Sequence, residues 1–101
     1  MVVFKLLRDG GVFLGTVSGN SEISRYDMDR WGDYWRFTNL SLKKLFTEYF
    51  REENITIQTY GNVFAANAFL QGLALEDIED KSLLNENDPD YQVTLGIRAV
   101  R

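Results

Sequence analysis

Side chains able to recognise a polar substrate gather in segment 25–36, "RYDMDRWGDYWR". Both tryptophans of the chain lie there, beside tyrosines, arginines and aspartates. Aromatic rings offer flat apolar faces, and arginines and aspartates offer charge-assisted hydrogen bonds. Together they suit the binding of a sugar or of another polar ring.

Two aspartates of this segment could also do chemistry. Asp27 and Asp29 have the residue type and the spacing of a general base or of a carboxylate pair. The alternative is that they are solvated loop residues, or that they cap a helix or a turn. A carboxylate-based hydrolase would depend on these two residues alone.

The other side chains of the segment have a structural alternative. The aromatic residues could plug the edge of a sheet, a reading that applies to Trp31, Tyr34, Trp35 and Phe37. Arg36 could then pair with a nearby aspartate. Under this reading the segment stabilises the fold and binds no substrate.

The composition excludes several classes of enzyme. The chain has no cysteine and no histidine. Disulfides, thiolate chemistry, zinc–thiolate sites and histidine-based triads are therefore impossible. We assign no catalytic residue and no metal ligand from the sequence.

Charge is distributed unevenly along the chain. The net charge is −4, and segment 76–90 holds seven acidic residues against Lys81 alone. No dense basic face exists, so we expect no nucleic-acid partner. The acidic segment lacks the spaced pattern of a calcium loop, which favours a solvated surface linker with a turn near Pro89.

Nothing in the sequence indicates a membrane or an export signal. No apolar run is long enough to cross a bilayer, and the start of the chain lacks a basic leading region and a cleavage site. We therefore expect a cytoplasmic protein with no membrane partner.

The spacing of apolar residues predicts one α/β domain over residues 1–101. Strands are expected at Val12–Val17, Ile55–Tyr60 and Tyr91–Val100. Helices are expected at Val2–Leu7, from Thr38 or Asn39 onward, and at Val63–Leu75. The middle helix has one apolar face, made by Leu42, Leu45, Phe46, Tyr49 and Phe50. Segment 18–37 is expected to be a long irregular loop, and such loops are usually functional.

These elements predict a small mixed sheet with flanking helices. Val12–Val17 is apolar without alternation, which is typical of a strand buried on both faces of a parallel sheet. The following strand–helix–strand unit favours a parallel arrangement with a right-handed crossover. The last strand is expected to pair antiparallel at the far side of the sheet.

The expected sheet leaves much hydrophobic surface to cover. Helix Val63–Leu75 is apolar nearly all round, so it must be covered on most sides, by its own sheet and also by a partner. The pattern at Val2–Leu7 is typical of the last two turns of a helix, which are too short to be stable alone. The chain therefore resembles the later part of a larger fold. We therefore expect a second polypeptide or a second copy of this chain, and no stable monomer.

Four stretches of the chain resemble a known family. "LLRDGGVFLGTVSG" is similar to the "hLKPGGhhhhohPG" block of class I S-adenosylmethionine-dependent methyltransferases. "ISRYDMDRWGDYWRFTNLSLKKLF", "YGNVFAANAFLQGLA" and "NDPDYQVTLGIRAV" resemble the C-terminal part of the methyltransferases often found with glycosyltransferases. The resemblance covers essentially the whole chain and implies a partial Rossmann-like fold, the C-terminal half of the methyltransferase domain.

The resemblance also implies a substrate site and a missing cofactor site. The residues that would line or cover the acceptor pocket are Arg25, Tyr26, Asp27, Trp31, Asp33, Tyr34, Trp35 and Arg36. The family's cofactor-binding first half precedes the region matched here, and the chain contains no G-x-G-x-x-G. S-adenosylmethionine would belong to the complete fold, with none bound by this chain alone.

Two functional hypotheses from different classes follow. The first is an acceptor-side fragment of an S-adenosylmethionine-dependent methyltransferase, inactive alone and completed by a chain that supplies the cofactor half. The second is a stand-alone interaction or regulatory protein that self-associates or completes a partner chain. The first predicts a neighbouring gene for the missing half, and the second predicts a stable homo-oligomer.

Overall fold

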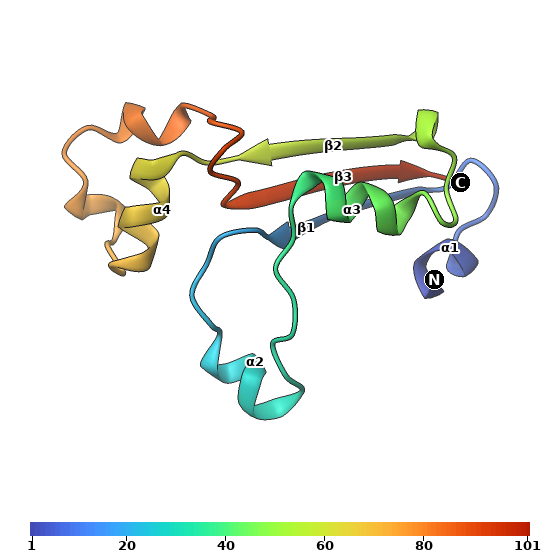
Figure 1. The fold of residues 1–101 in the computed structure, drawn as a ribbon, viewed down its shortest axis with the longest axis horizontal. Coiled ribbons are helices and arrows are strands. Elements are labelled where there is room, and N and C mark those ends of the chain that lie inside the picture. The colour runs from blue at the N-terminus through green and yellow to red at the C-terminus, as the bar shows by residue number, and fades with distance from the viewer.

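A computed structural model describes residues 1–101 as a mixed α/β fold built on a three-stranded antiparallel sheet. The strands are β1 (Val12–Ser18), β2 (Ile55–Tyr60) and β3 (Thr94–Val100). The α-helices are α1 (Val2–Leu6), α2 (Arg25–Arg30), α3 (Asn39–Phe46) and α4 (Val63–Leu70). Single turns of 3₁₀-helix lie at Glu52–Asn54, Leu75–Asp77 and Lys81–Asn85. Figure 1 shows α3 and α1 beside the sheet, with α2 and α4 beyond it.

The last strand lies in the centre of the sheet, which corrects the expected topology. The order is β1-β3-β2, and β3 pairs antiparallel with both neighbours. Leu95, for example, lies opposite Val17 on one side and Thr59 on the other. The expected parallel pairing of the first two strands and the place of the last strand at the far side are therefore both wrong. β1 and β2 do run in the same direction, but β3 separates them.

β1 is covered on one face only, which corrects the expectation of a strand buried on both faces. Its residues alternate between exposed and half-buried along the whole strand. Leu14 is 71% exposed, whereas its neighbour Phe13 packs against the core. The sequence hides this alternation, because large hydrophobic residues occur in both phases: Val12 and Leu14 on the exposed side, Phe13 and Val17 on the covered side.

The core lies between the sheet and α3. Its buried members are Leu42, Phe46, Phe50, Leu95, Ile97 and Ala99. The last three are alternate residues of β3, so one face of the central strand supplies half of the cluster. The cluster is aromatic on the helix side, where the rings of Phe46 and Phe50 stack with centroids 5.6 Å apart.

The first helix belongs to the same core. The ring of Phe4 meets Phe50 edge-on, with centroids 5.0 Å apart. Arg101 at the chain's other end donates hydrogen bonds to the carbonyl oxygens of Phe4 and Leu7, at 2.9 and 2.7 Å. The Leu7 carbonyl gains its partner in this way, and the Phe4 carbonyl, which already accepts the Leu7 N–H at 3.3 Å, gains a second one. The contacts with Phe50 and Arg101 thus hold in place a helix too short to persist alone.

The sequence located α3 well. Thr38 is the N-cap, and its hydroxyl accepts the N–H of Ser41 while the Ser41 hydroxyl accepts the N–H of Thr38. The expected apolar face is shorter than the pattern suggested, since the helix ends at Phe46 and Tyr49 lies beyond it, half-exposed.

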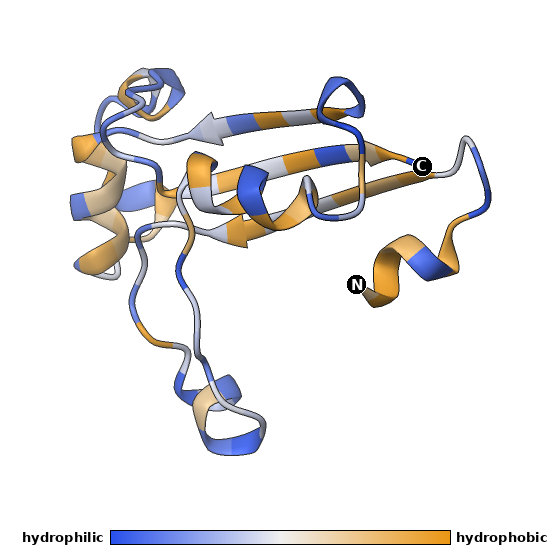
Figure 2. Cartoon of the chain, turned by 45° about the vertical axis from the view of Figure 1, so that its right-hand side comes forward, coloured by the Kyte–Doolittle hydropathy of each residue, from blue (hydrophilic) through white to orange (hydrophobic).

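α4 ends earlier than expected and is covered less. It stops at Leu70, and only Ala66 and Ala68 are buried along it. Figure 2 shows this helix largely in hydrophobic colours at the end of the sheet. The Nδ2 of Asn62, the capping residue, donates to the carbonyls of Leu83 and Glu86 at 2.8 and 2.6 Å, which ties the acidic segment to the helix start.

Both loops that the sequence predicted contain ordered structure. Segment 18–37, expected to be irregular throughout, contains the short helix α2. The expected turn near Pro89 is present, with the N–H of Tyr91 donating to the Asp88 carbonyl.

None of the helices combines the length and the apolar character that crossing a bilayer requires.

The two faces of the sheet predict different costs for the same substitution. Leu95 is 0% exposed and Leu14 is 71% exposed. Leu95→Ala is expected to lower the free energy of unfolding by about 2–5 kcal/mol, because it leaves a cavity in the core. Leu14→Ala, the matched control, is expected to change it by less than about 0.5 kcal/mol. Urea unfolding at low micromolar protein, followed by circular dichroism, measures both, and equal losses would contradict the one-sided core.

Candidate functional site

The segment predicted to bind a substrate forms an arm that leaves the sheet at the carboxyl end of β1. We call residues 19–37 the arm; Figure 1 shows it hanging from the sheet with α2 at its tip. The N–H of Gly19 donates to the Val93 carbonyl at 2.9 Å, and the N–H of Phe37 donates to the Ser18 carbonyl at 2.9 Å. Backbone hydrogen bonds therefore attach both ends of the arm to the end of the sheet, so the arm leaves and rejoins the sheet at neighbouring points.

Helix α2 arises from local signals in the arm. The Ser24 hydroxyl caps it by accepting the N–H of Asp27 at 3.3 Å. Arg25 pairs with Asp29 one turn later, at 3.3 Å, on the exposed side. Asp29 is therefore engaged in an ion pair. Asp27 and Asp29 lie two residues apart on α2, and side chains at that spacing do not face each other on a helix, so the geometry disfavours the alternative of a carboxylate pair.

A bidentate ion pair holds the neck of the arm together. The two terminal nitrogens of Arg36 donate to the two carboxylate oxygens of Asp33 at 2.6 and 2.9 Å. The Ser24 N–H donates to the same carboxylate at 3.1 Å, and Arg36 also donates to the Glu22 carbonyl at 2.8 Å. These bonds join segments 22–24 and 33–36, which lead into and out of α2 and which we call the neck of the arm. They confirm the alternative that Arg36 pairs with an aspartate.

The aromatic side chains of the arm are mostly exposed. Trp35 is 73% exposed and Tyr34 is 77% exposed, so neither plugs the sheet edge. Tyr26 and Trp31 form an edge-on pair with centroids 5.8 Å apart, and the Arg30 guanidinium lies 3.5 Å from the centroid of the Tyr26 ring. Among the aromatics of the arm, only Phe37 packs against the core, so the plug interpretation holds for that residue alone.

A polar pocket lies at the neck of the arm. It has a volume of about 230 Å³. Its lining comes from the arm, from the end of β1 and from one residue of α4, and consists of Ser18, Ser21, Glu22, Ser24, Asp27, Asp33, Arg36 and Phe69. We call it the arm pocket. It joins two segments that are far apart in the sequence and that follow the carboxyl ends of β1 and β2.

The arm pocket divides the predicted substrate residues into two groups. Asp27, Asp33 and Arg36 line it. The remaining five lie elsewhere on the arm: Arg25, Tyr26, Trp31, Tyr34 and Trp35. The structure thus brings together the charged residues of the neck and leaves the aromatics of the tip outside.

Sequence reasoning missed most of the remaining lining. Serines recur every third residue at Ser18, Ser21 and Ser24, from the last residue of β1 onward, and this spacing could have been noticed. Glu22 lies between them. Phe69 gave no signal, because it is one of many apolar residues on α4 and only the tertiary fold brings it to the arm.

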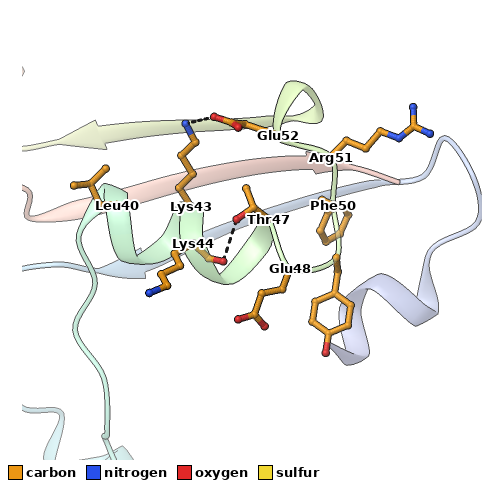
Figure 3. A pocket seen from close by; sticks show the side chains of 9 residues that line it. Leu40, Lys43, Lys44, Thr47, Glu48, Phe50, Arg51 and Glu52 are labelled. Atoms are coloured by element: carbon orange, nitrogen blue, oxygen red, sulfur yellow. Dashed lines mark hydrogen bonds and ion pairs between the residues drawn. The ribbon is translucent and has the colours of Figure 1, made fainter.

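A larger hollow runs along the outer side of α3 and has a different character. It measures about 650 Å³ (Figure 3). Lys43 crosses it to pair with Glu52 at 2.6 Å. Figure 3 shows Lys44, Glu48 and Arg51 pointing in different directions, so no set of polar groups converges there. Binding sites place a few polar groups around one point, which favours the arm pocket as the candidate site.

Gly15 in β1 and Gly19 directly after it allow close packing within the chain. A Cβ at Gly15 would lie 2.8 Å from the ring of Phe13, and a Cβ at Gly19 would collide with the Gln92 carbonyl. They do not form a glycine-lined cradle at a helix start of the kind that holds a dinucleotide. Gly15 and Gly19 therefore do not fit the glycine-rich turn that binds S-adenosylmethionine, which the resemblance places in the family's first half, before the region matched here. Nor does any group of three or more acidic side chains gather to hold a metal ion.

Comparison with known proteins leaves the geometry as the basis for any functional proposal. No protein-family model matches the chain, and neither a curated protein nor a solved structure matches it. The family resemblance of the sequence therefore stays a prediction.

The ion pair between Arg36 and Asp33 predicts a measurable lowering of the pKa of Asp33. Hydrogen bonds from Arg36, and then from the Ser24 N–H, lower the pKa of Asp33 from 3.8 to about 2. Because the pKa is lowered in the folded state, the pair stabilises the arm above pH 4, and this contribution is lost as the pH falls from about 4 to 2. A carboxyl ¹³C NMR titration is expected to give a midpoint near 2 for Asp33.

Two arginine variants test the cause of this shift. Arg36→Gln should move the Asp33 midpoint back toward 3.8. Arg25→Gln, the matched control, removes the pair with Asp29 and should leave the Asp33 midpoint in place. A midpoint that does not respond to Arg36→Gln would show that the ion pair is absent in solution.

Proposed function

We propose that this chain is the acceptor-side part of an S-adenosylmethionine-dependent methyltransferase, inactive alone and completed by a chain that supplies the cofactor half. The observation that carries the proposal is the position of the arm pocket. β1 and β2 run in the same direction with α3 between them in the chain, and the pocket lies beyond their carboxyl ends. In open α/β sheets, ligands bind outside the carboxyl ends of the strands.

The free edge of β1 is where a cofactor half would join. The Ser18 carbonyl points away from β3, since it accepts the N–H of Phe37 from the arm. In an antiparallel pair, the backbone N–H and C=O groups of every second residue point toward the paired strand, and those of the residues between them point away. The even-numbered residues of β1 therefore present their N–H and C=O groups to the outside, namely Val12, Leu14 and Thr16. A strand from another chain would find a regular row of backbone partners there.

The face of the sheet opposite α3 supports the same proposal. A hollow of about 470 Å³ lies on that face, lined among others by Leu14, Thr56 and Tyr60. Helices cover both faces of a doubly wound sheet, and this chain covers one. The uncovered face and the free edge adjoin at β1, so one additional half-domain could cover both.

Acceptor chemistry would then occur at the neck of the arm. Asp27 lines the pocket, and its carboxylate takes part in no hydrogen bond or ion pair within the chain. It can therefore bind a polar hydrogen of the acceptor. The part that this chain contributes is the positioning of the acceptor, which is a large component of group-transfer catalysis.

Reconstitution tests this function. The chain alone is expected to bind S-adenosylhomocysteine more weakly than about 100 μM, or roughly −5.5 kcal/mol. Together with the separately produced N-terminal half of a class I methyltransferase, it should bind more tightly than that value in calorimetry. Tight binding by the chain alone would contradict the half-site, and no binding in the mixture would contradict the proposed function.

A proline variant supplies the control for the edge. Thr16→Pro removes an outward N–H and keeps the bonds to β3, because proline is tolerated on an edge strand where its nitrogen faces outwards. This variant should fold and fail in the reconstitution. Val17→Pro is the contrasting variant, since it removes an inward N–H and should destabilise the sheet itself.

One observation favours a second function of another class, a self-associating interaction protein. β1 carries no charge and no proline, the usual devices that keep an edge strand from pairing. Two β1 edges could pair around a two-fold axis and join two sheets into one. In that case the chain would use its edge for its own copies and need no cofactor half.

The mass in solution separates the two functions. Self-association predicts a dimer or a larger species at high micromolar concentration, and Thr16→Pro should return it to a monomer. Sedimentation equilibrium measures both. A monomer that melts cooperatively at that concentration would contradict the second function and also the expectation that the chain is no stable monomer.

A further inference from the structure

We infer that the arm pocket binds a small ring that carries a protonated amine next to hydroxyl groups, such as an amino sugar. The inference deepens the proposed function and rests on it only for the role of this ligand as the methyl acceptor. The protonated amine would anchor the ring, since an ammonium nitrogen has no free electron pair with which to accept a methyl group.

The charges around the pocket favour a cation. Three carboxylates line it, from Glu22, Asp27 and Asp33, against the single guanidinium of Arg36. The carboxylates of Glu22 and Asp27 make no hydrogen bond or ion pair within the chain, so they keep their full capacity to accept from a ligand. A protonated amine adds an attraction between full charges to its hydrogen bond with either carboxylate, whereas a neutral hydroxyl gains the hydrogen bond alone.

The only cation of the pocket is already engaged, which disfavours an anionic ligand. Arg36 makes four hydrogen bonds, two to the Asp33 carboxylate, one to the Glu22 carbonyl and one to the Trp35 carbonyl. A guanidinium has five N–H groups. A phosphate or carboxylate would have to displace the hydrogen bonds that Arg36 makes within the arm. It would also be repelled by the unpaired carboxylates of Glu22 and Asp27.

The remaining lining indicates a small hydroxylated ring. Phe69 is the only aromatic residue that lines the pocket, and an aromatic ring can attract both an ammonium group and the apolar side of a sugar ring. Ser18 and Ser21 supply hydroxyls that can both donate and accept. At about 230 Å³ the pocket lies below the range of roughly 300–1,000 Å³ typical of drug-sized ligands, so it fits one ring.

Three matched sugars test the inference on the wild-type chain without any cofactor. Glucosamine, glucose and glucose 6-phosphate share one ring and differ in charge. Glucosamine is expected to bind at least tenfold more tightly than glucose in ligand-observed NMR titrations at low salt, and glucose 6-phosphate is expected not to bind. The glucosamine affinity should fall as salt is added, because the attraction is between charges.

Two isosteric variants locate the binding. Asp27→Asn removes a charge from the pocket and should lower the glucosamine affinity about tenfold while changing the glucose affinity little. Asp29→Asn removes a charge two residues away that pairs with Arg25 outside the pocket, and it should leave both affinities unchanged. Equal effects of the two variants would mean general attraction to an acidic protein.

The outcomes separate this inference from the proposed function. Glucosamine that binds no better than glucose, or that does not bind, overturns the amine-binding site whatever the reconstitution shows. A failed reconstitution with selective glucosamine binding would overturn the methyltransferase role and leave the amine site standing.

Discussion

The whole structure depends on β3 being paired along both of its edges. Hydrogen bonds to β1 and to β2 satisfy its backbone, and its inward residues Leu95 and Ala99 are 0% exposed. Buried backbone groups require such partners. Without β3 the other two strands would have no neighbour in this chain, and α3 would have no complete surface to pack on. The last residues of the chain therefore organise the elements that precede them.

The same strand positions the candidate site. Val93, directly before β3, accepts the N–H of Gly19 at the start of the arm and donates its own N–H to the Tyr60 carbonyl at the end of β2, both at 2.9 Å. One residue thus fixes the points at which the arm and the α4 segment leave the sheet. The contribution of Phe69 to a pocket otherwise built by the arm follows from this shared anchor, and pocket formation is a consequence of folding the sheet.

Local features of the fold could be predicted from the sequence, and features set by distant residues could not. Ile55–Tyr60 alternates in polarity, and the strand has those bounds. The cap at Thr38 and the pairing of Arg36 with an aspartate also depend on near neighbours. The open face of β1 was missed because both of its phases contain large hydrophobic residues. The position of β3 between β1 and β2 was missed because no local sequence pattern records which strands are neighbours.

The selectivity of the candidate site follows from the bond that builds it. The arm needs a cross-link at its neck, and Arg36 supplies it by committing its guanidinium to Asp33 and to two backbone carbonyls. That commitment removes the only cation that a ligand could reach. The charge presented to a ligand is then set by Glu22 and Asp27, which the arm does not need for its own structure. Because Arg36 is neutralised by Asp33 and the carboxylates of Glu22 and Asp27 stay free, the pocket presents negative charge to a ligand. The proposed preference for a cationic ligand therefore requires no residue from a partner chain.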